Sequence, residues 1–347
     1  MAAMKRGAKA GGRTAASDAA PAPAAPATLQ APLGQGRALQ RLLRLARGRT
    51  LHHAVVLSGP PGTGKGVVAR WLAAALLCPS ELDPDGPCGL CRTCRRVASG
   101  QHPDLHLLAP EPGKREIRVD AVRDLLDALL PHAVENGARV AIVDPASALN
   151  EEGQNALLKT LEEPGVDTFV LLPTSRPEAL LPTVRSRCER LGVQRLAPAL
   201  LAAELRRRLP TAGTHHERAT ALADGCLGRA LDACTEQAVQ LHDLVQAIVT
   251  GSKPLRAVAT ARAVLSLAEA PADAQRCARV FLAGLRAAAR THMRALADDA
   301  SGSYNLRASE PWTSLLTLVL CAEQDLDLQI PPEQALVGLL LEWSRRR

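Results

Sequence analysis

The sequence predicts an α/β protein in which helices flank a parallel sheet, followed by an all-helical C-terminal part. Three observations support this prediction. Short apolar runs alternate with helical patterns as far as about residue 196, which is typical of a doubly wound parallel sheet. A glycine-rich loop stands between the first apolar run and a helical stretch. After Leu196 only helical patterns remain.

Four apolar runs predict the strands, and four helical patterns predict the helices of the first part. The strands are expected at 53–58, 105–108, 140–143 and 169–172, and the helices at 37–49, 67–77, 119–130 and 150–163. Helical faces such as Phe281, Leu282 and Leu285 continue to the end of the chain. We therefore expect a module over 31–196, a small helical segment over 197–236 and a helical domain over 237–347.

The composition agrees with this architecture. Hydrophobic residues make up 47% of the 347 residues and aromatic residues only 2%, so the core is expected to be aliphatic, as in helices and buried parallel strands. The net charge of +7 weakly favours an anionic partner such as DNA. An Arg-rich and Ala-rich composition alone would give the same charge.

No segment has the pattern of a membrane span or a secretory signal. The apolar runs are far shorter than the ~20 residues that cross a bilayer. Residues 1–30 are rich in Ala and Pro and carry four basic residues, which favours a disordered tail over an organellar transit peptide. We expect a cytoplasmic protein without a membrane partner, whose nine cysteines stay reduced.

Residues 59–66 read Gly-Pro-Pro-Gly-Thr-Gly-Lys-Gly and lie between a predicted strand and a predicted helix. In this context the loop predicts a phosphate-binding P-loop, because glycines let backbone N–H groups close around phosphates. The expected phosphate-binding residues are Gly59, Gly62, Thr63, Gly64, Lys65 and Gly66. The alternative is a turn that binds nothing.

Two positions of this site lack the groups that ATP hydrolysis requires. Gly66 stands where a P-loop has the Ser or Thr that binds Mg²⁺. Asp144 follows an apolar strand, as the Walker B acid does, but Pro145 replaces the glutamate that activates water. General-base catalysis is worth ~10²–10⁴-fold. We therefore expect slow hydrolysis and leave open whether ATP and Mg²⁺ bind.

Four cysteines with the spacing Cys78-x9-Cys88-x2-Cys91-x2-Cys94 predict a zinc module over 78–94. Four thiolates close the tetrahedral shell of Zn²⁺, so the metal is expected to be structural. The insert is too small for a core of its own, and the metal would supply its folding energy. Disulfides or free thiols are the alternative. Flanking arginines allow a nucleic-acid contact, which we rank below a structural role.

Two further segments resemble the bacterial clamp-loader AAA+ subunits of DNA polymerase III. They are Asn155–Pro164 (NALLKTLEEP) and Leu181–Cys188 (LPTVRSRC). The zinc insert after the P-loop helix and the motif His102-Pro103-Asp104 are shared by the gamma/tau and delta-prime subunits of this family. The resemblance is strong over residues 31–236 and weak in the helical C-terminus. Gly66 and Pro145 favour the delta-prime branch, whereas retention of Lys65 departs from its most degenerate members.

The resemblance implies an AAA+ module with a helical lid over 197–236 and an oligomerising collar over 237–347. It implies a ring with gamma/tau and delta that loads the sliding clamp onto primed DNA during DNA replication, as part of a DNA-directed DNA polymerase holoenzyme. The chain would be a stator and a poor ATPase. Arg187, in Ser-Arg-Cys, would be an arginine finger acting on the neighbouring subunit's ATP.

Other residues match positions around the nucleotide in the family. Thr174 resembles the sensor 1 position, and Arg229 lies in a segment that resembles sensor 2. Gly34, Gln35, His53 and Ala54 resemble segments around the adenine, although ordinary loop and core roles fit them nearly as well. Two rival interpretations remain: the gamma/tau motor itself, and a zinc-dependent adaptor that binds nucleic acid outside any ring.

Overall fold

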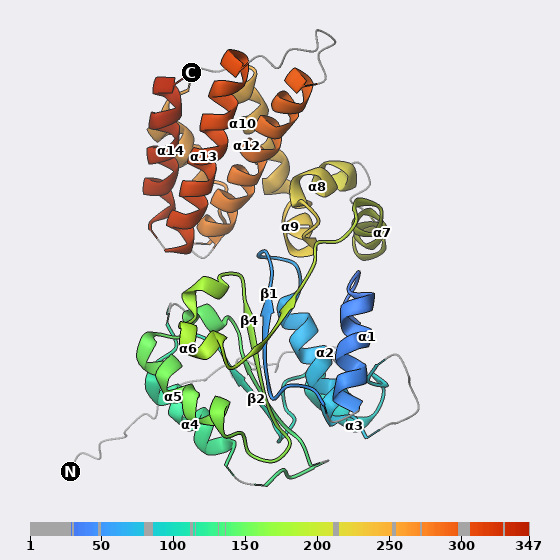
Figure 1. Ribbon diagram of the computed structural model, residues 1–347. Helices are drawn as coiled ribbons and strands as arrows, with labels where there is room; N and C mark the ends of the chain where they lie inside the picture. Colours follow the sequence, from blue (N-terminus) through green and yellow to red (C-terminus); the bar gives the residue numbers. More distant parts are fainter. Residues whose placement is uncertain are drawn as a thin grey trace, which may run out of the picture.

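The computed structural model describes residues 29, 31–47, 50–79, 86–111, 114, 116–130, 132–135, 137–210, 215–251, 255–270, 273–297, 306–328 and 330–346. The tail expected over 1–30 lies outside these residues, apart from Leu29. Three groups of elements follow one another along the long axis of Figure 1: an α/β module, three short helices and a helical bundle.

The module is built on a five-stranded parallel sheet of order β2-β3-β4-β1-β5. Its strands are β1 (Ala54–Ser58), β2 (Leu105–Leu108), β3 (Arg139–Val143), β4 (Thr168–Thr174) and β5 (Glu189–Gly192). The sequence predicted the first four and missed β5. This strand lies at the sheet edge, pairs only with β1 and is half-buried at alternate residues, so it carries no apolar run.

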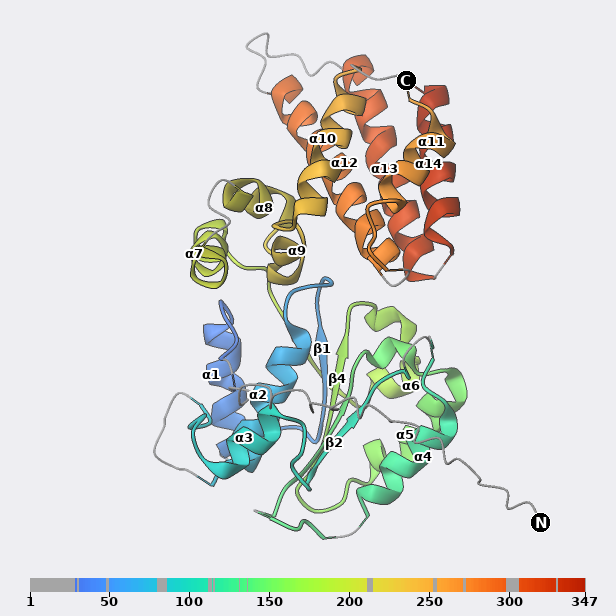
Figure 2. The ribbon, with the colours of Figure 1, turned by 180° about the vertical axis from the view of Figure 1, so that it is seen from behind.

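Helices cover both faces of the sheet. The helices α1 (Gly36–Arg47), α2 (Lys65–Leu77) and α3 (Arg92–Ala98) share one core with Val55 and Leu57 of β1. The helices α4 (Val119–Ala128), α5 (Glu151–Glu162) and α6 (Pro182–Arg185) lie on the opposite face with Ala54 and Val56, as Figures 1 and 2 show. The predicted α/β class with a parallel, helix-flanked sheet is confirmed.

Local sequence explains where the helix α5 begins. The side chain of Asn150 accepts a hydrogen bond from the backbone N–H of Gly153, and Glu151 and Glu152 occupy the first turn. Such a cap contributes ~1 kcal/mol, and acidic residues near a helix N-terminus favour its dipole. Leu157 and Leu161 then place the apolar face of α5 against the sheet.

Beyond β5, the residues that the structure describes form helices and their connections, as predicted. The short helices α7 (Pro198–Arg208), α8 (His215–Ala223) and α9 (Leu227–Asp232) pack around Leu201, Leu205 and Ala223. The bundle consists of α10 (Glu236–Val249), α11 (Ala257–Leu265), α12 (Asp273–Ala297), α13 (Leu306–Asp327) and α14 (Pro332–Arg346), packed around Phe281 and Trp343. None of the helices within the described ranges is long and apolar enough to cross a membrane.

The helix α7 contains a buried carboxylate that predicts a pH-dependent stability. Glu204 accepts hydrogen bonds from Arg207 (2.8 and 2.7 Å) and Arg208 (2.5 Å). The bonds from Arg207, and then those from Arg208, lower the pKa of Glu204 to about 2 from its ordinary 4.5. A depressed pKa stabilises the folded state above pH 4.5, and this contribution is lost as the pH falls towards 2.

We therefore expect Glu204→Gln to lower the melting temperature at pH 7 by a few degrees, since ~1 kcal/mol shifts it by about 2–4 °C in a chain of this size. The difference between variant and wild type should shrink between pH 4.5 and 3. Thermal denaturation at pH 7, 4.5 and 3 measures it. Glu217→Gln, an exposed residue of α8, is the control. A difference independent of pH would contradict the assignment.

Candidate functional site

The phosphate loop connects β1 to α2 at the carboxyl edge of the sheet. Gly62 and Gly64 have φ of 82° and 84°, a region that other residues rarely adopt. A Cβ added to Gly59 would lie 2.5 Å from the carbonyl oxygen of Val193. The path of the backbone therefore requires glycine at these three positions. This path brings the N–H groups of the loop close to the N-terminal end of α2.

The ammonium of Lys65 lies inside this loop. Its Nζ donates hydrogen bonds of 2.9 Å to the carbonyl oxygens of both Gly59 and Pro60, and Thr63 Oγ1 donates to Pro60 at 2.8 Å. Burial lowers the pKa of Lys65, while the carboxylate of Asp144 opposes that shift. The site thus holds a half-buried cation whose partners are neutral carbonyls, and a phosphate would be a stronger acceptor.

Gly66 and Asp144 contact each other directly. A Cβ at residue 66 would lie 2.5 Å from Oδ2 of Asp144, so this carboxylate occupies the space of the missing hydroxyl side chain. Burial raises the pKa of Asp144, and the charges of Arg70 and Lys65 act against that rise. Pro145 follows and is exposed. Of residues 66, 144 and 145, only Asp144 has a side chain that can approach a metal or a proton.

Thr174 and Arg229 both lie beside the phosphate loop, although they belong to distant segments of the chain. Thr174 ends β4 opposite Ser58, the last residue of β1 before the loop. It is fully buried, and its Oγ1 accepts a hydrogen bond from the N–H of Arg176 (3.1 Å). The backbone and Cγ of Arg229 lie 3.3 and 3.4 Å from a Cβ built on Gly62. Both predicted positions therefore border the loop.

The N-terminal end of α9 closes over the loop. The N–H of Gly228 donates to the carbonyl oxygen of Gly62 at 3.1 Å. Beside this contact lies a cavity of about 340 Å³ towards the bundle and another of about 270 Å³ towards the N-terminal segment. The smaller cavity is mostly apolar and includes Pro32, Leu33, Gly64, Val67, Leu196, Leu227 and Leu231. It therefore has the walls that an adenine ring requires.

The residues assigned to the adenine by resemblance lie in two places. Gly34 packs against Leu196, which lines the smaller cavity. Gln35 exchanges hydrogen bonds of 2.6 and 3.0 Å with the backbone of Gln194. The ring of His53 instead contacts the carbonyl of Leu161 at 2.8 Å, at the strand end opposite the loop. His53 and Ala54 thus lie away from the loop, which favours the ordinary core role that the sequence left open for them.

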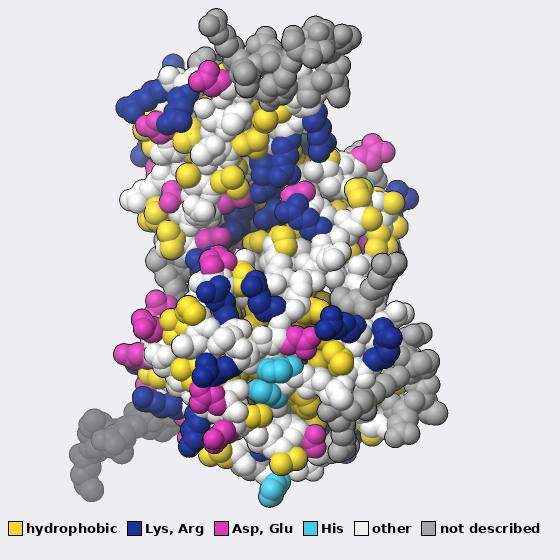
Figure 3. Space-filling view, in the orientation of Figure 1, with side chains coloured by type: hydrophobic (Ala, Val, Ile, Leu, Met, Phe, Trp, Pro, Cys, Tyr) yellow, Lys and Arg dark blue, Asp and Glu magenta, His cyan; other side chains and the backbone are white. Residues whose placement is uncertain are grey.

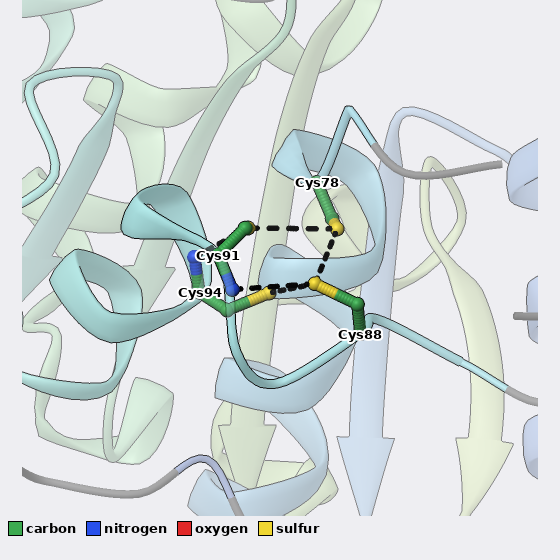
Figure 4. Close-up of side chains that lie close together, drawn as sticks. All are labelled: Cys78, Cys88, Cys91 and Cys94. Carbon is green, nitrogen blue, oxygen red and sulfur yellow. Dashed lines mark hydrogen bonds between the residues drawn. The ribbon is translucent and has the colours of Figure 1, made fainter. Parts of the chain in front are cut away.

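The four cysteines of the insert come together, as Figure 4 shows. All four Sγ atoms lie within 4.8 Å of one another. Cys78 lies 3.7 Å from Cys88 and 3.9 Å from Cys91, and Cys88 lies 3.9 Å from Cys94. A tetrahedron with Zn–S bonds of ~2.3 Å has S···S edges of about 3.8 Å, whereas a disulfide requires ~2.05 Å. The cluster therefore fits zinc and contains no disulfide.

Backbone geometry explains why these cysteines converge. Cys78 directly follows α2, and Cys91 caps α3. The N–H groups of Cys91 and Cys94 donate to the sulfurs of Cys88 and Cys91 at 3.4 and 3.3 Å. Backbone hydrogen bonds, first from Leu90, lower the pKa of the Cys88 thiol to about 6, which favours the thiolate that binds a metal.

The insert is packed directly on the P-loop helix. A Cβ at Gly86 would lie 2.5 Å from Cζ2 of Trp71, a buried residue of α2. Further along the chain, buried Asp104 accepts hydrogen bonds of 2.7 Å from the N–H groups of Val134 and Glu135. Glu135 in turn pairs with Arg96 of α3 at 2.8 Å. The His102-Pro103-Asp104 motif thus serves packing in this chain.

Arg187 lies just after α6 and is partly exposed. Its Nη1 donates to the carbonyl oxygen of Thr183 at 3.0 Å, and its Nη2 pairs with Glu162 of α5 at 2.6 Å. These partners belong to α5 and α6, on the opposite face of the sheet from α2. The guanidinium is therefore presented at a surface of the module rather than towards the chain's own α2.

Sequence reasoning missed Gln154, which connects α5 with the segment preceding α6. Its side chain is 3% exposed. It donates to the carbonyl oxygens of Leu149 (3.1 Å) and Ala179 (3.2 Å) and accepts from the N–H of Leu181 (2.6 Å). These bonds tie α5 to the segment that enters α6. The one available signal was a glutamine on the apolar side of α5, beside Leu157 and Leu161.

Comparison with known proteins shows which subunits the α/β module resembles. Residues 34–197 match the family described as DNA polymerase III, delta subunit. The chain is 46% identical to the DNA polymerase III subunit delta' of Pseudomonas aeruginosa over 142 residues, 41% of this chain and 43% of that protein. Over residues 34–197 the chain is thus similar to the delta-prime subunits of DNA polymerase III. The Escherichia coli member is 45% identical over 139 residues, 40% of this chain and 41% of that protein.

The delta-prime family is related to gamma/tau. The chain is 34% identical to the DNA polymerase III subunit tau of Salmonella typhimurium over 259 residues, 72% of this chain and 39% of that protein. It thus spans about two fifths of the length of these relatives. A DNA polymerase III gamma subunit-related protein from Thermotoga maritima has a TM-score of 0.45 at 18% identity, covering 90% of this chain and 99% of that one.

Proposed function

We propose that the chain is a delta-prime-type subunit of the DNA polymerase III clamp loader, which helps load the sliding clamp onto primed DNA. Its proposed partners are gamma/tau and delta in a hetero-oligomeric ring. The observation that carries this proposal is the phosphate loop. It keeps Lys65 but has the Asp144 carboxylate in the place of a hydroxyl at residue 66 and Pro145 in the place of a base. The similarity of residues 34–197 to delta-prime subunits supports it independently.

Contacts between the three groups of elements support a stator role. The lid is joined to the phosphate loop through Gly228 and Gly62. Four residues before Gly228, Asp224 pairs with Arg195 of the connection to the sheet at 2.5 Å and with Arg290 of α12 at 3.4 Å. These contacts attach the turn between α8 and α9 to the phosphate loop, to the connection from the sheet and to the bundle, which would limit opening and closing of the lid. We propose domain boundaries at 196/197 and 236/237, on either side of this lid.

Two sites would carry the chain's contribution to the loader. Arg187 is proposed as the arginine finger for the ATP of the neighbouring subunit, where a planar cation offsets charge on the transferred phosphoryl group. The four cysteines are proposed to hold a structural Zn²⁺, which supplies a closed tetrahedral linkage and no open position for chemistry. The sulfur separations support this assignment.

Assembly tests the proposed function. The chain should elute from gel filtration together with gamma/tau and delta, and its omission should abolish clamp loading on primed DNA. A specific observation favours gamma/tau itself as the second candidate, since the likeness to tau extends over 72% of the chain. A motor subunit would hydrolyse ATP by itself. A chain that ignores both partners would instead be the nucleic-acid-binding adaptor.

Nucleotide binding at this loop is expected not to depend on Mg²⁺. Lys65 and Arg229 supply positive charge, whereas residue 66 supplies no metal ligand. We therefore expect the dissociation constant for ADP to change less than about 3-fold when EDTA replaces Mg²⁺. This factor corresponds to ~0.7 kcal/mol of binding free energy. Steady-state turnover of ATP by the isolated chain should stay below about 0.1 per second, under the range of typical enzymes.

Titration calorimetry with and without metal, together with a phosphate-release assay, measures both quantities. Lys65→Ala is the control and should abolish the binding. Tight binding only in the presence of Mg²⁺, or turnover of several ATP per second, would contradict the assignment of the loop.

A further inference from the structure

The proposed finger is already paired within its own chain. Nη2 of Arg187 lies 2.6 Å from Oε1 of Glu162, and the two side chains are 37% and 49% exposed. The guanidinium and the carboxylate together carry no net charge. A paired arginine therefore attracts a phosphate much less than a free one does. If Glu162 stayed in place, its carboxylate would also repel the phosphate that Arg187 is meant to meet.

We propose that Glu162 restrains Arg187 in the free subunit and that the guanidinium leaves this carboxylate when an ATP-loaded neighbour docks. This inference rests on the proposed role of Arg187 as a finger in trans. The carboxylate and the triphosphate compete for the same planar donor group, which both can engage through two N–H groups. Glu162 is thus a positioning residue that sets how readily the finger becomes available.

The surrounding structure confines this exchange to side chains. Gln154 ties α5 to the segment entering α6 through its hydrogen bonds with Ala179 and Leu181. The bond from Nη1 of Arg187 to the carbonyl of Thr183 stays within α6 and its next turn. The backbones of residues 162 and 187 are therefore held relative to each other. Turning the guanidinium away from Glu162 requires no rearrangement of the sheet or its helices.

The strength of the ion pair allows Arg187 to leave Glu162. An exposed ion pair stabilises by ~0.2–1 kcal/mol, which corresponds to about 1.4- to 5-fold in an equilibrium constant at an RT of ~0.59 kcal/mol. A pair of this strength keeps most of the arginine restrained in the free subunit. It is too weak to compete with a phosphoryl group of higher charge in a drier interface. Removing the pair should therefore tighten association with the ATP-loaded neighbour.

Glu162→Gln tests this inference. We expect the dissociation constant for gamma/tau bound to a non-hydrolysed ATP analogue to fall by about 1.5- to 5-fold. The constant for nucleotide-free gamma/tau should stay the same, since no phosphate is present to take the arginine. Raising KCl from 50 to 300 mM should reduce the gain, because salt screens the exposed pair. Fluorescence anisotropy of the labelled full-length chain measures all of these constants.

Two controls separate the inference from the function on which it rests. Glu163→Gln removes the same charge from the next residue, which is also exposed, and should leave the constants unchanged. In an Arg187→Ala background, Glu162→Gln should have no effect. If Arg187→Ala weakens association but Glu162→Gln fails to strengthen it, the restraint does not exist. If Arg187→Ala changes neither association nor hydrolysis, the finger role itself fails.

Discussion

In the reassembled clamp loader, Arg187→Ala is expected to lower ATP hydrolysis at the site facing this chain by on the order of 10³-fold. A cation at the transferred phosphoryl group is worth ~10³–10⁵-fold in related reactions. The total steady-state rate should fall less, because the other sites of the ring would use the arginines of other subunits. Single-turnover hydrolysis by the assembled loader distinguishes the ATP site that has lost Arg187 from the remaining sites.

Folding and assembly should survive this substitution. The contacts of Arg187 are a partly exposed ion pair and hydrogen bonds at the surface, and changes at such positions usually stay within ±0.5 kcal/mol. Arg187→Lys should recover little activity, because an ammonium lacks the planar donor fork. Arg190→Ala, at an exposed residue of β5, removes the same charge nearby and should leave the rate unchanged. Full hydrolysis without Arg187 would refute the finger assignment.

Loss of the metal from the four-cysteine cluster should have the second largest effect. Structural zinc contributes apparent free energies of ~10–16 kcal/mol in small peptides, and the insert has little else to hold it. Chelation, or Cys94→Ser at the buried cysteine of the cluster, should therefore disorder residues around 86–94. Trp71 would lose its contact with Gly86, and its fluorescence should shift to the red.

Metal analysis and tryptophan emission, measured on one preparation, check this expectation. About one zinc per chain should be found in the wild type and none after Cys94→Ser. The red shift should disappear in a Trp71→Phe variant, which separates Trp71 from the two tryptophans of the bundle, Trp312 and Trp343. Cys321→Ser, at an exposed cysteine of α13, should change nothing. A metal-free chain with unchanged emission would show that the insert folds without zinc.

Much of the fold could be predicted from local patterns in the sequence. The run at 140–143 corresponds to β3, because a strand buried on both faces must be apolar throughout. The run at 105–108 corresponds to the edge strand β2, which is only partly buried. The glycines of the loop were recognised because only they fit its backbone. β5 escaped because an edge strand needs an apolar residue only at alternate positions, and Leu191 alone met that need.

Some features of the candidate site could likewise be predicted from local sequence, and others could not. The residues of the loop and of the cysteine cluster are neighbours in sequence, and their spacing predicted their chemistry. Other contacts of the site join residues that are distant in the chain or whose sequence neighbours are of a different type. They are the contact of Gly66 with Asp144, the packing of Gly86 on Trp71 and the hydrogen bonds of Gln154. No periodicity or spacing reveals such contacts.

The sequence alone therefore established the α/β class, the helical C-terminal part, a P-loop pattern without Ser or Thr at residue 66, and the four candidate metal ligands. Each of these depends on a local rule: strand burial, backbone freedom of glycine, or the soft thiolate set that zinc prefers. Only the folded chain revealed that Asp144 fills the space beside residue 66, that Gly228 covers Gly62, and that Glu162 holds Arg187. These relations depend on where separate helices and strands pack, and packing is a property of the whole core rather than of any segment.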